Sequence, residues 1–200
     1  MASDVFGILR PAIHGPQKTI VVLGAPRGGT SMVAATLRKL GIMMGERLGH
    51  QHEDPLFRKA VPLEEKVRTV ERRNREHDVW GWKLPNSVYY LEELLPHLRN
   101  PHFVAIFRNP YSISRSSAER DGRDYDAHVL EVAVNHTKMV IDLVARLESP
   151  TALASFESAI KDPTKFTQGL ADFIGVGGDE GLVASAAQQA VNTKLNYLKF

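Results

Sequence analysis

The chain of 200 residues is 43% hydrophobic and 24% charged, which excludes wholesale disorder and predicts a single domain over residues 1–200. It has no cysteine, so disulfides, thiolate nucleophiles and thiolate zinc sites are excluded, and a reducing compartment such as the cytoplasm is expected. A net charge of +2 is too small to indicate nucleic-acid binding. Residues 1–17 lack the apolar core of a secretory signal and the longest apolar run is only strand-length, so we expect neither export nor membrane binding.

The first predicted elements are a strand, a glycine-rich turn and a helix. Residues 18–23 (KTIVVL) form a β-branched run that ends at Gly24, which is typical of a strand buried on both faces. A helix is predicted over residues 31–40, because its apolar residues recur at helical spacing and Gly41 follows as a stop signal. This order of elements is typical of the start of an α/β domain.

Strands and helices continue to alternate along the chain. Further strands are predicted at residues 79–84, 103–107 and 151–156. Further helices are predicted at residues 62–76 and 87–95, from residue 110 onward, and at 126–147, 163–174 and 179–200. Such alternation predicts a three-layer α/β/α architecture around a central, largely parallel sheet.

Several charged residues are interpreted from their neighbours in the sequence. His136 falls on the apolar stripe of the helix at 126–147 and is predicted to be a buried core residue. A basic run interleaved with glutamates predicts an exposed, salt-bridged helix; its arginines are Arg68, Arg72, Arg73 and Arg75. Three arginines after the third strand, Arg115, Arg120 and Arg123, are interpreted as a solvated face or as an entrance for an anionic ligand.

The turn GAPRGGTS (24–31) fits the register of the Walker A pattern GxxxxGK[ST], except that Thr30 replaces the lysine. Its backbone N–H groups and the start of the next helix are expected to form an anion cradle, with Arg27 as a fixed positive charge. Together with the alternation of elements, this turn predicts a fold like that of P-loop nucleotide hydrolases. Without the lysine that grips a triphosphate, the cradle suits a phosphate or sulfate group better than magnesium-bound ATP or GTP.

Combined with a second segment, this turn resembles the sulfotransferases that use 3′-phosphoadenosine 5′-phosphosulfate (PAPS). The turn matches their 5′-phosphosulfate loop, and FRNPYSISRS supplies Arg108 at a strand end with Ser116 eight residues later, as in their second signature. The resemblance implies that Arg108 and Ser116 hold the 3′-phosphate. It also implies that the 5′-phosphosulfate is held by Arg27, Gly28, Gly29, Thr30 and Ser31.

Two weaker matches extend the resemblance, so that its motifs lie within about residues 18–176. GWKLPN (81–86) is similar to a Trp-Lys-x-Pro stretch of bacterial members, and residues 152–176 resemble their late strand and Asp-Pro helix. The sequence has no Arg-Lys-Gly element near residue 200, where cytosolic members have a further contact to the 3′-phosphate. The effect of this departure on nucleotide affinity is left open.

Three side chains are predicted to take part in catalysis. Arg27 is expected to stabilise charge on the bridging oxygen. Lys83, at the end of a predicted central strand where such sheets bind ligands, is assigned to the sulfonate or leaving group. The segment 45–57 is similar to a bacterial stretch whose glutamate falls on Glu53, the expected general base. His52 is the alternative base, because its ordinary pKa of about 6.5 suits proton abstraction.

The sequence thus favours a PAPS-dependent sulfotransferase that needs no metal ion and acts on a small-molecule or carbohydrate acceptor. One alternative is an atypical P-loop nucleotide kinase or NTPase, based on the Walker register. Another is a non-catalytic nucleotide-binding protein on the same scaffold. The sequence indicates neither the acceptor nor the oligomeric state.

Overall fold

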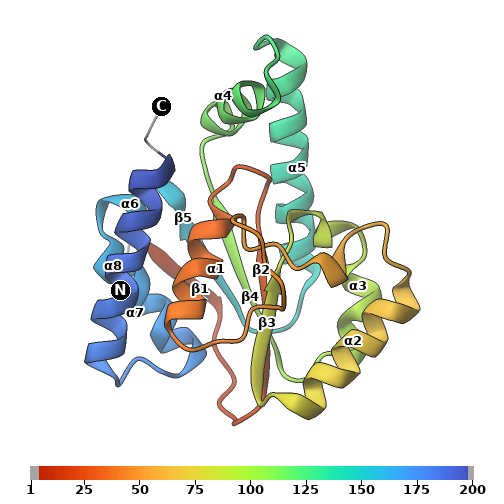
Figure 1. Cartoon of the computed structure of the whole chain (residues 1–200), viewed down its shortest axis with the longest axis vertical. Helices are drawn as coiled ribbons and strands as arrows, with labels where there is room; N and C mark the ends of the chain where they lie inside the picture. The colour runs from red at the N-terminus through yellow and green to blue at the C-terminus, as the bar shows by residue number, and fades with distance from the viewer. Residues whose placement is uncertain (1–4, 198–200) are drawn as a thin grey trace.

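A five-stranded sheet lies at the centre of the computed structural model, which describes residues 5–197, with side chains up to residue 188 (Figure 1). The strands are β1 (Phe6–Arg10), β2 (Lys18–Leu23), β3 (Val79–Lys83), β4 (Pro101–Phe107) and β5 (Thr151–Ser155). Their order is β1-β5-β4-β2-β3, and every neighbouring pair is parallel except β1 with β5. The predicted α/β fold with a largely parallel sheet is confirmed.

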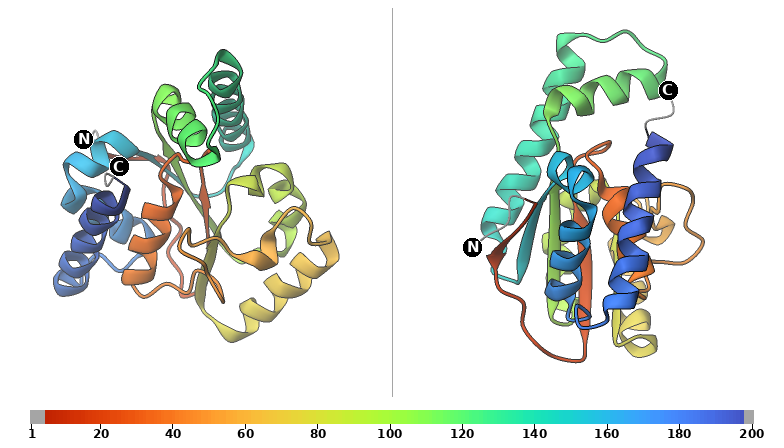
Figure 2. Two further views of the ribbon diagram at one scale, coloured as in Figure 1. Left: turned by 45° about the horizontal axis from the view of Figure 1, so that its top comes forward. Right: turned by 90° about the vertical axis from the view of Figure 1, so that its left-hand side faces the viewer.

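Helices cover both faces of the sheet (Figures 1 and 2). Those on one face are α1 (Thr30–Lys39), α6 (Phe156–Lys161), α7 (Pro163–Ile174) and α8 (Glu180–Tyr197). Those on the other are α2 (Leu63–Glu76), α3 (Leu91–Leu94) and α5 (Ala127–Arg146). Within β2, Ile20 belongs to the first core and Val21 to the second. This burial on both sides explains the continuous apolar run of β2.

The α4 helix (Pro110–Asp121) and the first half of α5 extend beyond the carboxyl ends of the strands (Figure 1). The Asn109 side chain caps α4 by accepting hydrogen bonds from the backbone N–H groups of Tyr111 and Ser112. Asp126 caps α5 in the same way through the N–H of Val129. In Figure 1, the hairpin formed by α4 and α5 lies above the carboxyl ends of the parallel strands.

The edge strand β1 was absent from the sequence prediction. Phe6 is buried against the rings of Phe166 and Phe173, whereas the next apolar residues, Ile8 and Leu9, are 52% and 46% exposed. An antiparallel edge strand with adjacent exposed apolar residues has neither the alternation nor the continuous burial that identifies a strand in sequence.

Several predicted element boundaries were wrong, among them those of two strands, since β3 ends at Lys83 and β4 begins at Pro101. The single helix expected at residues 87–95 is a 3₁₀ turn (Pro85–Tyr89), the short α3 and a second 3₁₀ turn (Leu95–His97), and the break falls at Tyr90, whose φ of −141° and ψ of −1° are not helical. The strand expected to end at residue 156 ends at Ser155, whose hydroxyl caps α6 at the N–H of Ser158. The other predicted helices are confirmed, and residues 198–200 of the predicted last helix lie outside the described residues.

Of the two predictions about polar residues on helices, the one for His136 is confirmed and the one for the basic run is wrong at Arg73. His136 is buried, as predicted, and its Nε2 lies 3.4 Å from the carbonyl oxygen of Pro85. Arg73 contradicts the prediction of an exposed basic run, because its side chain is fully buried while that of Arg72 on the same helix is 37% exposed. Among residues 5–197, no helix is long and apolar enough to cross a membrane.

Candidate active site

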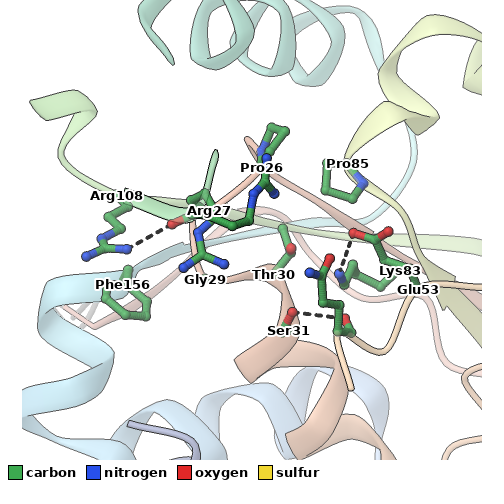
Figure 3. Close-up of a pocket in the computed structure, with 12 residues that line it drawn as sticks. Pro26, Arg27, Gly29, Thr30, Ser31, Glu53, Lys83, Pro85, Arg108 and Phe156 are labelled. Atoms are coloured by element: carbon green, nitrogen blue, oxygen red, sulfur yellow. Dashed lines mark hydrogen bonds and ion pairs between the residues drawn. The ribbon is translucent and has the colours of Figure 1, made fainter. Parts of the chain in front are cut away.

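A pocket lies at the carboxyl ends of β2, β3 and β4, where parallel α/β sheets bind their ligands (Figure 3). The space inside it that water can occupy is about 40 Å³, within a wider opening of about 480 Å³ that includes open solvent. It is lined by Pro26, Arg27, Gly29, Thr30, Ser31, Gln51, Glu53, Lys83, Pro85, Arg108, Arg120 and Phe156. The structure therefore brings together most of the site residues predicted from the sequence.

The glycine-rich turn between β2 and α1 is tightly folded. The N–H of Gly28 donates to the carbonyl of Ala25, and Gly29 precedes the helix with a φ of 98°. A Cβ on Gly29 would lie 2.3 Å from a ring carbon of Phe156, so only glycine fits there. Arg27 has a φ of 64°, a left-handed conformation that is costly outside glycine and that concentrates at functional sites.

The two phosphate motifs of the sequence are in direct contact (Figure 3). The Nε of Arg27 donates to the hydroxyl of Ser116 at 2.9 Å, although these residues are 89 positions apart. Arg108 donates through Nη1 to the carbonyl oxygen of Arg27 at 2.9 Å, and its guanidinium lies 4.6 Å from the ring centre of Phe156. Ser116 and Gly28 do not line the pocket themselves, but Ser116 holds Arg27, which does.

Lys83 and Glu53 form an ion pair on the opposite side of the pocket. The Nζ of Lys83 lies 3.2 Å from Oε1 of Glu53, and the lysine is 1% exposed. Burial lowers the pKa of Lys83, and the Glu53 carboxylate acts in the opposite sense and raises it. A buried ammonium beside one carboxylate is placed to interact with a negative group that enters the pocket.

The two hydroxyl residues of the turn are buried and partly engaged. Thr30 is 3% exposed, and the Ser31 hydroxyl donates to the carbonyl oxygen of Gln51 at 2.9 Å. This bond ties the start of α1 to the loop that carries Glu53. Gln51 was absent from the sequence prediction, since an isolated glutamine on a polar loop has no distinguishing pattern.

The two alternative bases are placed differently. Glu53 lines the pocket and His52 does not. The Nδ1 of His52 lies 3.1 Å from Nη1 of Arg38. Because a guanidinium can only donate, Nδ1 accepts and the proton of the neutral ring is assigned to Nε2. Burial, followed by the charges of Arg38 and Lys83, lowers the pKa of His52.

Three further residues that line the pocket had been given no site role, and a fourth, Arg120, had been interpreted only as part of a solvated face or an entrance. Pro26 and Pro85 stand on opposite sides of its upper end in Figure 3, and Phe156 forms part of its wall. Arg120 is also part of the lining and bonds Asp121 at 2.8 Å, which matches the interpretation of an entrance better than that of a solvated face. These residues come together through folding, although Pro26 and Pro85 lie within the segments on which the resemblance was based.

Solved sulfotransferase structures share this architecture. The sulfotransferase domain of the Synechococcus PCC 7002 olefin synthase aligns with 100% of this chain and 86% of its own, with a TM-score of 0.58 and 16% identity. Sulfotransferase STF9 from Mycobacterium avium aligns with 94% of this chain and 70% of its own, with a TM-score of 0.56 and 13% identity. No protein-family model and no curated protein matches the sequence. The chain has a sulfotransferase-like fold, and at these identities the likeness concerns the fold alone.

Proposed function

We propose that this protein transfers a sulfonate group from PAPS to a hydroxyl or amine of a small-molecule or carbohydrate acceptor. The observation that carries the proposal is the contact of Arg27 with Ser116 and Arg108 at one pocket. The sulfotransferase-like fold supports it, because the pocket lies where this α/β architecture binds ligands.

The residues of the pocket suit a polyanionic nucleotide. Among the described residues, four cationic side chains line it, those of Arg27, Lys83, Arg108 and Arg120, against the one carboxylate of Glu53. In the proposal, the turn from Arg27 to Ser31 holds the 5′-phosphosulfate at the N-terminus of α1, where backbone N–H groups attract anions. Arg108 and Ser116 hold the 3′-phosphate from the other side of Arg27.

The nucleotide, when bound, supplies the sulfonate group and a phosphate leaving group. Arg27 and the N–H groups at the start of α1 neutralise the charge that develops at the leaving group. The buried Lys83 supplies a second positive charge, and Glu53 accepts the proton of the acceptor because it is the carboxylate of this pocket. No metal ion takes part in the proposed step.

The proposal predicts a specific effect of Arg108 on nucleotide binding. Calorimetric titration of the wild-type protein should show tighter binding of 3′-phosphoadenosine 5′-phosphate than of ADP, without metal. Arg108→Ala should weaken binding of the 3′-phosphorylated nucleotide about 10- to 100-fold, since a hydrogen bond to a charged group contributes about 1.5–3 kcal/mol. The affinity for ADP should change much less. Arg115→Ala, an exposed arginine of the following helix α4, is the matched control and should bind as wild type.

Other outcomes point to the alternatives. An equal loss of affinity for both nucleotides in Arg108→Ala would remove its assignment to the 3′-phosphate. A preference for magnesium ATP would indicate a kinase or NTPase with an unusual loop. If 3′-phosphoadenosine 5′-phosphate binds but no acceptor in a broad screen with PAPS is sulfonated, the non-catalytic function is favoured.

A further inference from the structure

A buried ion pair anchors the loop that carries Glu53, outside the pocket itself. Asp54 and Arg73 have fully buried side chains, and Nη1 of Arg73 lies 2.5 Å from Oδ2 of Asp54. The guanidinium of Arg73 lies beside two stacked aromatic rings, 5.5 Å from the centre of Phe57 and 5.4 Å from that of Trp80. Helix α2 thus reaches the loop through a charged side chain in the core.

Asp54 joins this helix to the end of β3. Its Oδ1 accepts from the N–H of Leu56 at 3.1 Å, and its own N–H donates to the carbonyl oxygen of Lys83 at 3.4 Å. The preceding residue, Glu53, contacts the Nζ of the same lysine. Two consecutive loop residues therefore hold Lys83, one through the main chain and one through the side chain.

The rest of the loop is built closely around Asp54. Gly45 has a φ of 127°, and a Cβ there would lie 2.5 Å from Oδ2 of Asp54. His52, next to Glu53, has a φ of 55°, which is an unfavourable conformation for a residue with a side chain. Arg72 adds an outer contact to the loop, 2.7 Å from the carboxylate of Glu46. The backbone on both sides of Glu53 is therefore held in one conformation.

The ion pair is poorly explained as a source of stability. Within the described residues, Nε and Nη2 of Arg73 are buried and make no hydrogen bond, so the desolvation of the guanidinium is only partly compensated. Buried ion pairs can often be replaced by apolar residues of similar volume without loss of stability. The inward face of an amphipathic helix normally carries apolar residues, and a buried arginine there breaks this rule. Such departures are expected near functional sites.

We propose that Arg73 and Asp54 are positioning residues that hold the Glu53 carboxylate against Lys83. This inference rests on the proposed function for its catalytic meaning, because Glu53 is the proposed base and Lys83 the proposed sulfonate ligand. The pair acts through the loop backbone and touches neither nucleotide nor acceptor. Its loss should separate Glu53 from Lys83 while leaving the phosphate turn at α1 intact.

Two glycines of the same loop provide a matched pair of variants. Gly45→Ala pushes a methyl group against Asp54 without removing either charge. Gly41→Ala is the control, because Gly41 also has a positive φ, of 83°, but has open space where its Cβ would be. The readout is the pKa of Lys83, from the ¹³Cε shift in lysine-labelled protein, assigned with Lys83→Arg. The decrease of this pKa in Glu53→Gln is the reference for the other variants, because the Glu53 carboxylate raises the pKa of Lys83.

The proposal expects Gly45→Ala to lower the pKa of Lys83 by at least half as much as Glu53→Gln, and Gly41→Ala to leave it unchanged. The double variant Arg73→Met with Asp54→Asn removes both charges and covers the case in which Gly45→Ala does not fold. It should lower the Lys83 pKa similarly, and Glu53→Gln added to it should lower this pKa by less than Glu53→Gln does in the wild-type protein. With any sulfonated acceptor, kcat should fall about tenfold or more at unchanged nucleotide affinity.

An unchanged Lys83 pKa in either folded variant would overturn the inference. A purely structural role for the ion pair would lower the melting temperature without this change in Lys83. The proposed function is tested separately by nucleotide binding to the wild-type protein. If the wild-type protein does not bind the nucleotide as expected, the effect of Arg73 on the pKa of Lys83 can still be measured. The failure of the proposed function can therefore be distinguished from the failure of this inference.

Discussion

Gly29 connects the phosphate turn to the far side of the pocket, because the space of its missing Cβ is taken by the ring of Phe156. Phe156 in turn lies against the guanidinium of Arg108. A single position without a side chain thus allows the turn, the start of α6 and the arginine after β4 to come together. The ring of Phe156 leaves no room for a side chain at this position, which explains why the second residue of the GGTS segment is glycine.

We predict that Gly29→Ala destabilises the protein more than a glycine substitution without a steric clash. Gly122→Ala is the control, because Gly122 has a φ of 60° but open space at its Cβ position. The control should lose about 1–2 kcal/mol of unfolding free energy from the left-handed conformation alone. Gly29→Ala should lose at least about 2 kcal/mol more, since the ring must move. Urea unfolding measures both values.

The clash also predicts a non-additive double variant. Phe156→Ala alone should cost about 3–5 kcal/mol as a buried aromatic residue. Added to Gly29→Ala, it should cost clearly less, because the colliding ring is gone. Strict additivity would show that the contact of Gly29 with Phe156 does not limit the turn.

At the scale of elements, the two ends of β1 differ in burial. Phe6 is buried and makes edge-on contacts with Phe166 and Phe173, at 6.3 and 6.2 Å between ring centres. A Cβ on Gly169 of α7 would lie 2.9 Å from the Phe6 ring, so helix and strand pack closely there. The outer part of the strand, around Ile8, is open to solvent.

Substitutions along β1 should therefore have very different effects. Phe6→Ala should lower the unfolding free energy by about 3–5 kcal/mol, because it removes a buried aromatic side chain. Ile8→Ala, in the same strand with 52% exposure, should cost under about 1 kcal/mol. Comparable losses for the two variants in urea unfolding would contradict this description of the strand.

At the scale of the whole molecule, three histidines are held in their neutral form. Burial lowers the pKa of His102 and of His136, and together with nearby positive charges it lowers that of His52. As the pH falls, a histidine whose pKa is lowered by folding becomes protonated at a higher pH in the unfolded chain than in the folded protein. The unfolded state then binds more protons below the ordinary pKa of about 6.5, so stability decreases as the pH falls through that value.

We expect the unfolding free energy to decrease on acidification from pH 7.5 to pH 5. Each fully depressed histidine contributes a slope of at most about 1.4 kcal/mol per pH unit in this window. His102→Gln, in the core at β4, should reduce the slope relative to the wild-type protein. A slope that is identical in wild type and His102→Gln would exclude a contribution from this residue.

The pattern of the sequence by itself determined the four parallel strands, most helices, and the position of Lys83 and Arg108 at strand ends. These features depend on short apolar runs, glycines and prolines, whose effects are local. Only the tertiary structure decided that Arg27 bonds Ser116, 89 residues away, that Glu53 lines the pocket where His52 does not, and that Arg73 is buried on Asp54. Such contacts join distant segments through helix packing and burial, and a charged side chain has the same local sequence signal in solvent as in the core.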